Sequence, residues 1–300
     1  MLKQLFAASL CLVGSLSFNA YAAKIYIDTG VDYGANHLPK ANGPTTTGWL
    51  NQLAFTYNSQ SVVQDTDGNG VLSAGDTIVA TLGINSAGNN DISQNFFTSL
   101  IPGQFGGGAT SHNGFGNNWG MTFGSANLTG TWDGSQFVYS SGTIDVYLFD
   151  ATSDLSDPSS LIRLFSLEIL TGGNNSIGQG LEFDGHVTNF GTDSFNGISA
   201  GDIFSVETFP GSGDGISFEE YSLLNDPFLV KFFLDTNTDS TTASWLSGGS
   251  NTFGIFDGAT ATIGGQHDGS LVFDVPEPLS ISILGAGLLM LAGFSRRRMS

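Results

Sequence analysis

Short runs in which apolar and polar residues alternate follow one another along most of the chain, separated by polar stretches rich in glycine. Residues 24–27 and 77–82 alternate most clearly, and their β-branched and aromatic side chains are typical of strands. Residues 217–224 have a mixed pattern that favours a short helix. Further strand-like runs lie at residues 53–63, 120–132, 136–149, 161–170, 181–190, 201–209, 228–234, 252–263 and 270–275. The pattern predicts an all-β fold class.

The number and spacing of these runs indicate how the strands are arranged. About a dozen strands, with turn signals roughly every ten residues, predict a β-sandwich, with a jelly roll as one form of it. Ser141-Gly142 interrupts one alternating stretch and predicts a hairpin between residues 136–140 and 143–149. Composition does not change abruptly between residues 23 and 274, so we expect one domain there.

The first 22 residues have a pattern of their own. Lys3 precedes an apolar run at residues 5–18, and Ala20 and Ala22 supply the small residues of a signal peptidase site. This order predicts a secretory signal peptide at residues 1–22, which is removed from the mature protein. Cys11 is the single cysteine of the chain and lies in this segment, so we expect the mature domain to hold no disulfide.

Residues 275–300 have another distinct pattern. An uncharged apolar run at residues 279–294 follows two prolines and precedes a cluster of arginines. As a helix this run rises about 1.5 Å per residue and nearly crosses a hydrocarbon core, while the arginines mark its cytoplasmic end. We therefore predict a short transmembrane helix, with a buried core helix as the alternative. The residues that flank the run are Pro276, Glu277, Pro278, Arg296, Arg297 and Arg298.

The order of triplet, apolar run and arginines resembles the PEP-CTERM sorting signal of Gram-negative bacteria. The resemblance implies export by the secretion machinery across the inner membrane, transient anchoring in that membrane, and processing by an exosortase. It further implies release to the cell surface or extracellular matrix, often in bacteria that make exopolysaccharide. Runs such as residues 217–221 and 230–235 look like those of the flocculation-associated kind. The chain departs from the pattern by continuing past the arginines as Met299-Ser300.

Charge narrows the choice of partners. All of the 27 acidic residues except Glu277 lie between residues 23 and 275. The basic residues there are Lys24, Lys40, Arg163 and Lys231, so four basic and 26 acidic side chains give a net charge of −22. Such a surface repels nucleic acid and anionic lipid, and we expect neither as a partner. Hydrophobic residues make up 40% of the chain, which is too much for a disordered protein.

Residues 65–76, DTDGNGVLSAGD, have the spacing of a calcium-binding loop. Ca²⁺ takes about six to eight oxygen ligands, and side chains at loop positions 1, 3 and 5 converge on one point. Gly70 at position 6 permits the sharp turn that this convergence requires. The predicted calcium ligands are Asp65, Asp67, Asn69, the carbonyl of Val71, Ser73 through a water, and Asp76 at the closing position. Closure by Asp in place of Glu resembles the loops of dockerins and other extracellular calcium modules.

Three observations leave the calcium prediction open. Residues 77–81 alternate like a strand, so the loop joins two strands, and a hairpin connection that binds nothing is the alternative. Residues 196–202 repeat the end of the loop without acids that match Asp65 and Asp67. Ser-Ala-Gly-Asp therefore also serves as a turn before a strand. Residues 235–239 form another oxygen-rich run, which lacks the glycine and the closing acid.

Catalytic signatures are poor. Residues 197–201 match the Gly-x-Ser-x-Gly pattern of a nucleophile elbow, but a strand-like run follows where that motif needs a helix. No spacing among the histidines or carboxylates selects a catalytic set. The tryptophans, expected mainly in the core, are Trp49, Trp119, Trp132 and Trp245. We therefore expect a non-catalytic surface or matrix protein for aggregation, flocculation or biofilm with exopolysaccharide. The alternative is a secreted module that binds or cleaves carbohydrate.

Overall fold

The computed structural model describes residues 21–22, 24–34, 38–85, 87, 89–102, 110–124, 126–174, 180–208, 213–224, 229–235 and 259–275. Contacts between Cα atoms divide the chain into two units, one of residues 1–22 with 275–300 and one of residues 23–274. Apart from residues 21, 22 and 275, the first unit lies outside the described residues, as do the predicted transmembrane helix and most of the signal peptide. Across the ranges given above, no helix is long and apolar enough to cross a membrane.

Strands dominate the part of the chain that the structure describes, which confirms the all-β class. The strands are β1 Tyr21–Ala22, β2 Ile25–Ile27, β3 Leu50–Gln64, β4 Thr77–Leu82, β5 Phe96–Pro102, β6 Trp119–Phe123, β7 Ala126–Trp132, β8 Phe137–Ser141, β9 Thr143–Asp150, β10 Ile162–Asn174, β11 Gly180–Thr188, β12 Ser194–Phe195, β13 Ile198–Ser199, β14 Phe204–Glu207, β15 Gly215–Ser217, β16 Leu229–Asp235 and β17 Thr260–Val275. The helices are η1 Ile92–Gln94, η2 Pro158–Ser160, α2 Ala200–Ile203 and α3 Phe218–Leu224.

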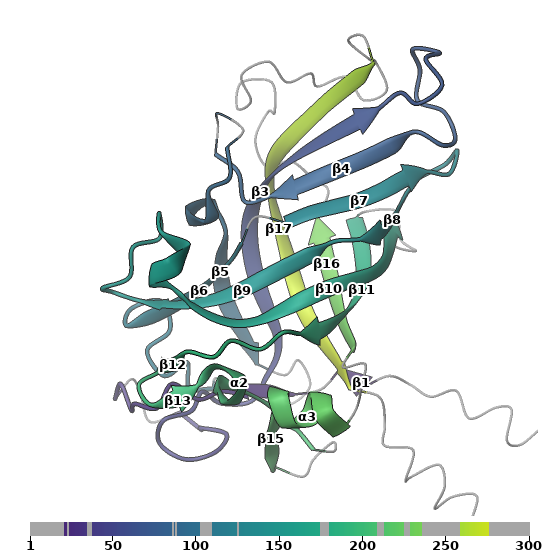
Figure 1. Cartoon of the computed structure of the whole chain (residues 1–300). Coiled ribbons are helices and arrows are strands. Elements are labelled where there is room, and N and C mark those ends of the chain that lie inside the picture. Colours follow the sequence, from purple (N-terminus) through teal and green to yellow (C-terminus); the bar gives the residue numbers. More distant parts are fainter. Residues whose placement is uncertain are drawn as a thin grey trace, which may run out of the picture. The chain divides into compact units, whose positions relative to one another are not determined.

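One antiparallel sheet organises residues 23–274, and it closes on itself. Among the described strands, hydrogen bonding leads from β3 through β4, β7, β8, β10, β11, β16 and β17 back to β3. The closing ladder is long, because β3 and β17 pair without interruption from Leu53↔Leu271 to Gln64↔Thr260. A β-sandwich has two separate sheets, whereas here one continuous sheet folds over. Figure 1 shows β7, β9 and β10 crossing in front of β3 and β17.

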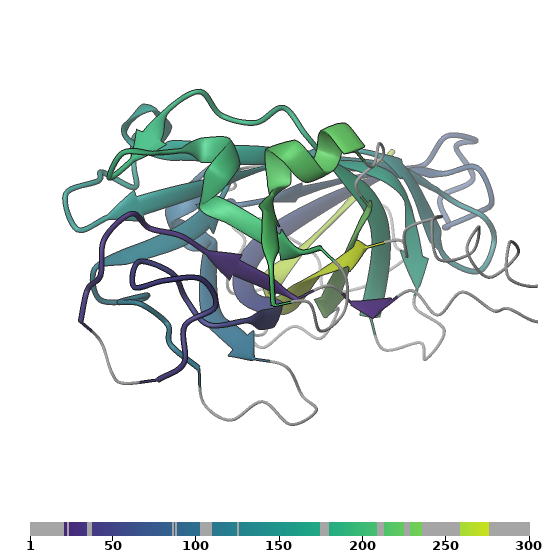
Figure 2. The ribbon, with the colours of Figure 1, turned by 90° about the horizontal axis from the view of Figure 1, so that it is seen from below.

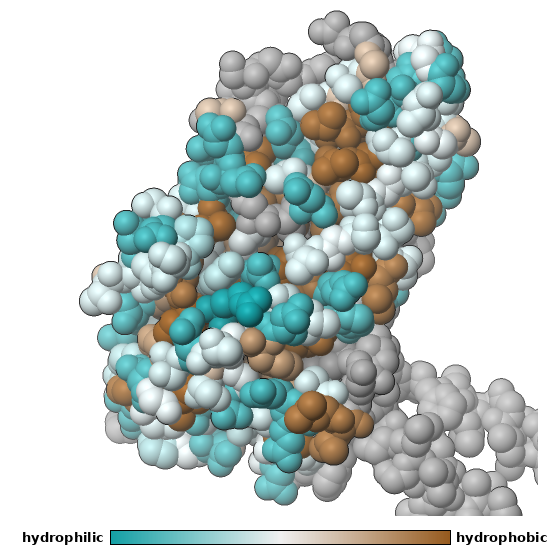
Figure 3. Space-filling model, in the orientation of Figure 1, coloured by the Kyte–Doolittle hydropathy of each residue, from teal (hydrophilic) through white to brown (hydrophobic). Residues whose placement is uncertain are grey.

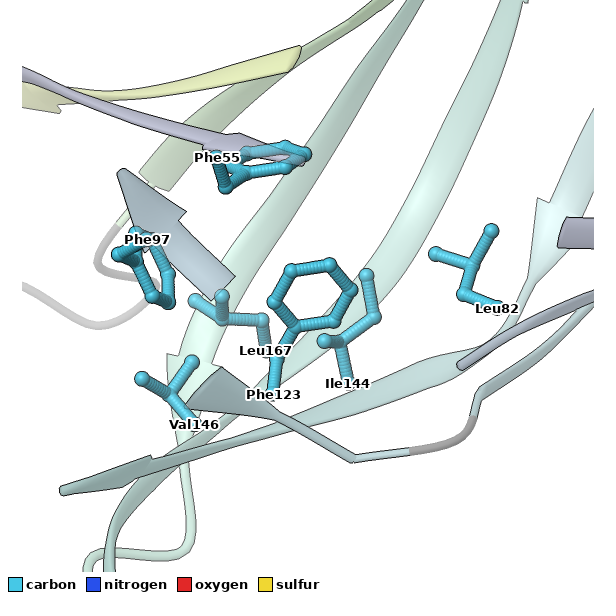
Figure 4. A pocket seen from close by; sticks show the side chains of 7 residues that line it. All are labelled: Phe55, Leu82, Phe97, Phe123, Ile144, Val146 and Leu167. Atoms are coloured by element: carbon cyan, nitrogen blue, oxygen red, sulfur yellow. The ribbon is translucent and has the colours of Figure 1, made fainter. Parts of the chain in front are cut away.

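The two facing parts of this sheet enclose an apolar core. Alternate residues of β9 point inward, and Ile144, Val146 and Leu148 are 4%, 1% and 0% exposed. Rings from the opposite part meet them, since Phe55 of β3 lies 5.2 Å from Phe123 of β6 between ring centroids. Figure 4 shows side chains converging from six strands, and they are Phe55 of β3, Leu82 of β4, Phe97 of β5, Phe123 of β6, Ile144 and Val146 of β9, and Leu167 of β10. The space left among them is about 10 Å³ and has only apolar lining, so it is a packing gap and not a ligand pocket.

The predicted hairpin at Ser141-Gly142 is wrong. β8 and β9 run one after the other along β10 in a single register, with Tyr139 opposite Gly172 and Thr143 opposite Glu168. The turn lies instead at residues 133–136, where Trp132 pairs with Phe137. The Asp133 carboxylate accepts the N–H groups of Ser135 and Gln136 there, at 2.7 and 2.9 Å, which stabilises the turn.

The short helices α2 and α3 lie at one end of the sheet, next to β14. Phe218 of α3 packs on Phe204 of β14 and on Phe273 of β17, with ring centroids 5.1 and 4.9 Å apart. Figure 2, seen from this end, shows α2 and α3 next to each other, and both contact β14. The helix predicted at residues 217–224 is confirmed as α3. The strand predicted at residues 201–209 is wrong at residues 201–203, which belong to α2, and correct over Phe204–Glu207, which form β14. Residue 209 lies outside the described residues.

Candidate metal centre

The loop of residues 65–76 joins β3 to β4 at the end of the sheet opposite α3. Both ends of the loop are tied to neighbouring strands. The Asp65 N–H donates to the Ala259 carbonyl next to β17, at 2.9 Å. The Trp132 N–H donates to the Asp76 carbonyl at 2.7 Å, which extends the pairing of β4 with β7. The loop therefore has fixed ends, which lowers the entropy lost when it closes around a ligand.

Three carboxylates converge inside this loop. Oxygens of Asp65, Asp67 and Asp76 all lie within 4.8 Å of one another, so these residues could hold a metal ion. Asp65 and Asp76 are buried, at 7% and 0% exposure, whereas Asp67 is exposed. Gly68 and Gly70 allow the convergence, because they adopt φ angles of 72° and 78° that other residues rarely take.

Backbone N–H groups hold the two buried carboxylates in place. The carboxylate of Asp65 accepts the N–H groups of Gly68 and Gly70, at 2.7 and 2.8 Å. The carboxylate of Asp76 accepts the N–H groups of Ser73 and Thr66, at 2.7 and 2.9 Å, and the Thr66 hydroxyl at 3.1 Å. An ionised carboxylate has about four acceptor positions, so each keeps some free for a cation.

The same hydrogen bonds keep these groups ionised. The Gly70 N–H, with support from the Gly68 N–H, holds the pKa of Asp65 below its ordinary range. Burial raises the pKa of Asp76, but the hydrogen bonds from Ser73 and Thr66 outweigh burial and keep that pKa low as well. Both groups are therefore fully charged at neutral pH.

This negative charge has no cationic partner among the basic side chains that the structure describes. Lys24 pairs with Glu207 at 3.9 Å, Lys40 with Asp32 at 2.6 Å, and Arg163 with Asp145 at 3.9 Å. None of these pairs includes an acid of the loop. Carboxylates this close repel one another, and a bound cation relieves the repulsion.

The other predicted side-chain ligands, Asn69 and Ser73, are hydrogen-bonded to the Asp67 carboxylate. The Asn69 amide donates to the Asp67 carboxylate at 2.8 Å, and the Ser73 hydroxyl does so at 3.0 Å. The Asn69 side-chain oxygen accepts the Val71 N–H at 2.8 Å. The structure thus brings Asp65, Asp67 and Asp76 together and places Asn69 and Ser73 beside them, while a ligand role for the Val71 carbonyl stays a prediction.

Two residues beside the centre were missed by the sequence analysis. Thr66 donates both its N–H and its hydroxyl to Asp76, and its place directly after the first Asp is a usable signal. Trp132 lies more than fifty positions along the chain, and only the pairing of β4 with β7 brings its backbone to the loop. No pattern in the sequence indicates that contact.

The partial repeat at residues 196–202 has a different structure. It forms the end of a short ribbon of β12 and β13 and the single turn of α2, where the Ser199 hydroxyl donates to Asp202 at 2.7 Å. Ser199 has φ −68° and ψ 149°, an ordinary extended conformation and not the strained turn of a nucleophile elbow. Among the residues that the structure describes, the three acids of the loop at 65–76 form the group whose side-chain oxygens lie close enough together to hold a metal ion. The predicted run at 235–239 lies beyond them from residue 236 onward.

The tryptophans pack against neighbouring rings. Trp119 is 2% exposed and donates its indole N–H to the Asn113 carbonyl at 2.8 Å, as expected of a core residue. Trp49 and Trp132 are half-buried, against Tyr26 and Phe137, with ring centroids 5.1 and 5.0 Å apart. Trp245 lies outside the described residues.

The sorting and cleavage residues predicted at the two ends mostly lie outside the described part of the chain. This holds for Ala20, Pro276, Glu277, Pro278, Arg296, Arg297 and Arg298, while Ala22 is the last residue of β1. Comparison with protein-family models, with curated proteins and with solved structures gives no match.

Proposed function

We propose that this chain is a non-catalytic protein of the cell surface or extracellular matrix, exported across the inner membrane of a Gram-negative bacterium and sorted by an exosortase. The observation that carries the proposal is the pairing of two end segments. Residues 1–22 have the order of a signal peptide, and residues 276–298 have the Pro-Glu-Pro triplet, apolar run and arginines of a sorting signal. The protein acts outside the cell in aggregation, flocculation or biofilm, together with exopolysaccharide.

We further propose that Ca²⁺ is the cation of the loop at residues 65–76. Its converging donors are carboxylate oxygens, the ligands that a hard cation prefers, and they come from the loop positions that calcium sites use. All three carboxylates accept backbone N–H groups before any ion arrives, and the two buried ones accept two each. A weak affinity suffices outside cells, where extracellular calcium modules bind in the range of about 10⁻⁴ to 10⁻³ M.

For the architecture, we propose a sandwich-like domain. Two layers of one continuous sheet face each other across the core, as the Phe55–Phe123 contact between β3 and β6 indicates. A jelly-roll arrangement of the strands stays a prediction.

Deletion of the gene in the cells that produce the protein tests the proposed function. We expect slower settling and less polysaccharide retained by the cells, and restoration of both by the unaltered gene. A second complementing gene, with Arg296, Arg297 and Arg298 all changed to Ala, should not restore them, because the arginines complete the sorting signal. Unchanged settling and unchanged matrix in the deletion strain would contradict the proposal.

A further inference from the structure

The outer face of β6, β9 and β10 carries aromatic rings that lie against the sheet. Inward residues of β9 alternate with Asp145, Tyr147 and Phe149, which face outward and are half-buried. Gly120, opposite Phe149 on β6, has no side chain, and a Cβ there would lie 2.5 Å from Cζ of the Phe149 ring. Gly124 similarly leaves room for Tyr147, whose Cε2 lies 3.2 Å from the corresponding position.

These glycines leave room for the two rings to reach over β6, since the outer ring atoms, Cζ of Phe149 and Cε2 of Tyr147, lie nearest to the missing Cβ positions. Phe96 of β5 meets Phe149 edge to face, with centroids 6.5 Å apart, and closes one side of the group. Rings held in this way have little rotational freedom left to lose when a partner stacks on them.

Polar groups of both kinds stand beside the rings on the same face. The Asp145 carboxylate accepts the Ser166 hydroxyl and lies 3.9 Å from the Arg163 guanidinium. Asp145 and Arg163 remain 37% and 39% exposed. Arg163 also donates to Ser166 at 3.4 Å, which still leaves most of its five N–H donors for a partner. Figure 3 shows this face of the molecule, where strongly hydrophilic residues lie among apolar ones over β9 and β10.

The Tyr147 hydroxyl interacts electrostatically with both Asp145 and Arg163. Burial and the neighbouring Asp145 raise the pKa of its hydroxyl, although Arg163 opposes them. The hydroxyl is therefore neutral at pH 7, and it can donate and accept a hydrogen bond next to the ring.

We propose that this face, with Tyr147 and Phe149 as stacking rings and Asp145 and Arg163 as polar contacts, binds an uncharged polysaccharide. A sugar ring offers an apolar face of C–H groups for stacking, and hydroxyls that both donate to a carboxylate and accept from a guanidinium. The net charge of −22 between residues 23 and 275 repels polysaccharides that carry carboxylates or sulfates. On the β6 side this face is covered, because Thr122, opposite Tyr147, is buried and donates to the Ile92 carbonyl. In the other direction it continues to the exposed Thr143 and Glu168, along which a polymer can lie. The inference rests on the proposed function in one respect, which is the choice of exopolysaccharide as the kind of partner.

Affinity electrophoresis of the purified full chain tests this inference. Gels would contain dextran, amylose, galactomannan or hydroxyethyl cellulose as neutral polymers, and alginate as an acidic one. We expect retardation by at least one neutral polymer and none by alginate. Tyr147→Ala should weaken that binding about three- to tenfold, the range that loss of one aromatic contact gives. Tyr147→Phe should retain the binding, because the ring is kept.

Two further variants make the result decisive. Asp145→Asn keeps the shape of the face but removes a charge-assisted acceptor, and it should weaken binding several-fold even if Tyr147→Ala fails to fold. Tyr33→Ala removes a half-buried tyrosine far from β9 in the chain, and binding should not change. Retardation by none of the four neutral polymers would overturn the inference, as would equal retardation of the unaltered protein, Tyr147→Ala and Asp145→Asn. The inference would also be overturned if retardation rose with protein concentration and did not depend on the polymer, because a second copy of the chain would then occupy this face. Settling of cells is a separate readout, so the two proposals can fail separately.

Discussion

Asp65 and Asp76 are buried and each accepts two backbone N–H groups, whereas Asp67 is exposed and accepts one. The Gly70 and Ser73 N–H groups that fix the two buried carboxylates cannot turn away without unfolding the loop. The Asp67 carboxylate accepts one backbone N–H, from Asn69, and its other partners are the side chains of Asn69 and Ser73, which can rotate. Replacing Asp67 therefore removes a charge from the centre and leaves the frame of the loop intact.

We expect Ca²⁺ to raise the melting temperature of the unaltered protein, and Asp67→Ala to abolish that rise. At a Ca²⁺ concentration of about a hundred times Kd, binding stabilises the folded state by about 2.7 kcal/mol. Thermal unfolding with Ca²⁺ or with a chelator measures the effect. Luminescence of Tb³⁺ sensitised by Trp132, whose backbone N–H donates to the Asp76 backbone carbonyl, reports occupancy directly.

Asp202→Ala is the matched control for that experiment. Asp202 takes the place of Asp76 in the partial repeat, but it accepts the Ser199 hydroxyl and belongs to no group of acids that could hold a metal among the described residues. This variant should keep the full response to Ca²⁺. If the melting temperature of the unaltered protein does not respond to millimolar Ca²⁺, the calcium assignment is wrong.

At the scale of the elements, β8 and β9 show what alternation predicts and what it leaves open. The alternation over residues 136–149 changes phase between Tyr139 and Ile144, and the structure has two strands there that follow one another along β10. Gly142 was interpreted as a turn because glycine is common in hairpins. Here its Cβ position lies 3.0 Å from the Asn127 carbonyl oxygen, so the glycine allows close approach of β7. Sequence shows that a glycine is present, but it does not distinguish a turn from a close approach.

Gly130→Ala should destabilise the fold by about 1–3 kcal/mol, the usual cost of overpacking a core position. Gly130 is buried at a bulge in the pairing of β7 with β8, and a Cβ there would lie 2.6 Å from the Val138 carbonyl oxygen. Backbone atoms of a paired strand cannot move aside as a side-chain end can. Urea unfolding measures the loss, and Ser140→Ala, at an exposed position of β8, should change stability little. Equal stability of Gly130→Ala and the unaltered protein would show that the bulge is not tightly packed.

At the scale of the whole molecule, the acids make stability depend on pH. The pKa values of Asp65, Asp76 and Asp133 lie below the ordinary value of 3.8, because each carboxylate accepts hydrogen bonds from the backbone. Unfolding raises these pKa values, so the groups stabilise the fold fully above about pH 5 and stop doing so as the pH falls through their folded-state values. On the alkaline side, burial raises the pKa of Tyr221 to about 12, so its contribution is lost as the pH rises from 10 toward that value.

We therefore expect the free energy of unfolding to be level between about pH 5 and 9 and to fall below about pH 4. Urea unfolding in a chelator and about 0.5 M salt measures it, because the salt screens the general repulsion among the acids. Asp76→Asn should show a shallower acid limb, since one of the responsible groups is gone. An unfolding free energy that stays level down to pH 2 would contradict the pKa directions.

The sequence by itself determined the local features of this protein. The strands at residues 77–82 and 181–188 and the helix at 218–224 follow from side-chain spacing, which local burial enforces. The convergence of Asp65, Asp67 and Asp76 also follows from spacing within one loop, as does the turn at Gly70. The two end segments are compositional signals, and their interpretation depends on no fold.

The tertiary structure decided everything that depends on distant pairing. β5 was not predicted, because its apolar residues run together without alternation and it is β3 that makes it a strand. β17 is one strand, although the glycines in its middle divide its apolar pattern into two predicted pieces. The closure of the sheet rests on the ladder between β3 and β17, which lie some two hundred residues apart. The rings of Tyr147 and Phe149 on β9 lie over Gly124 and Gly120, and these residues become neighbours only when β6 and β9 pair.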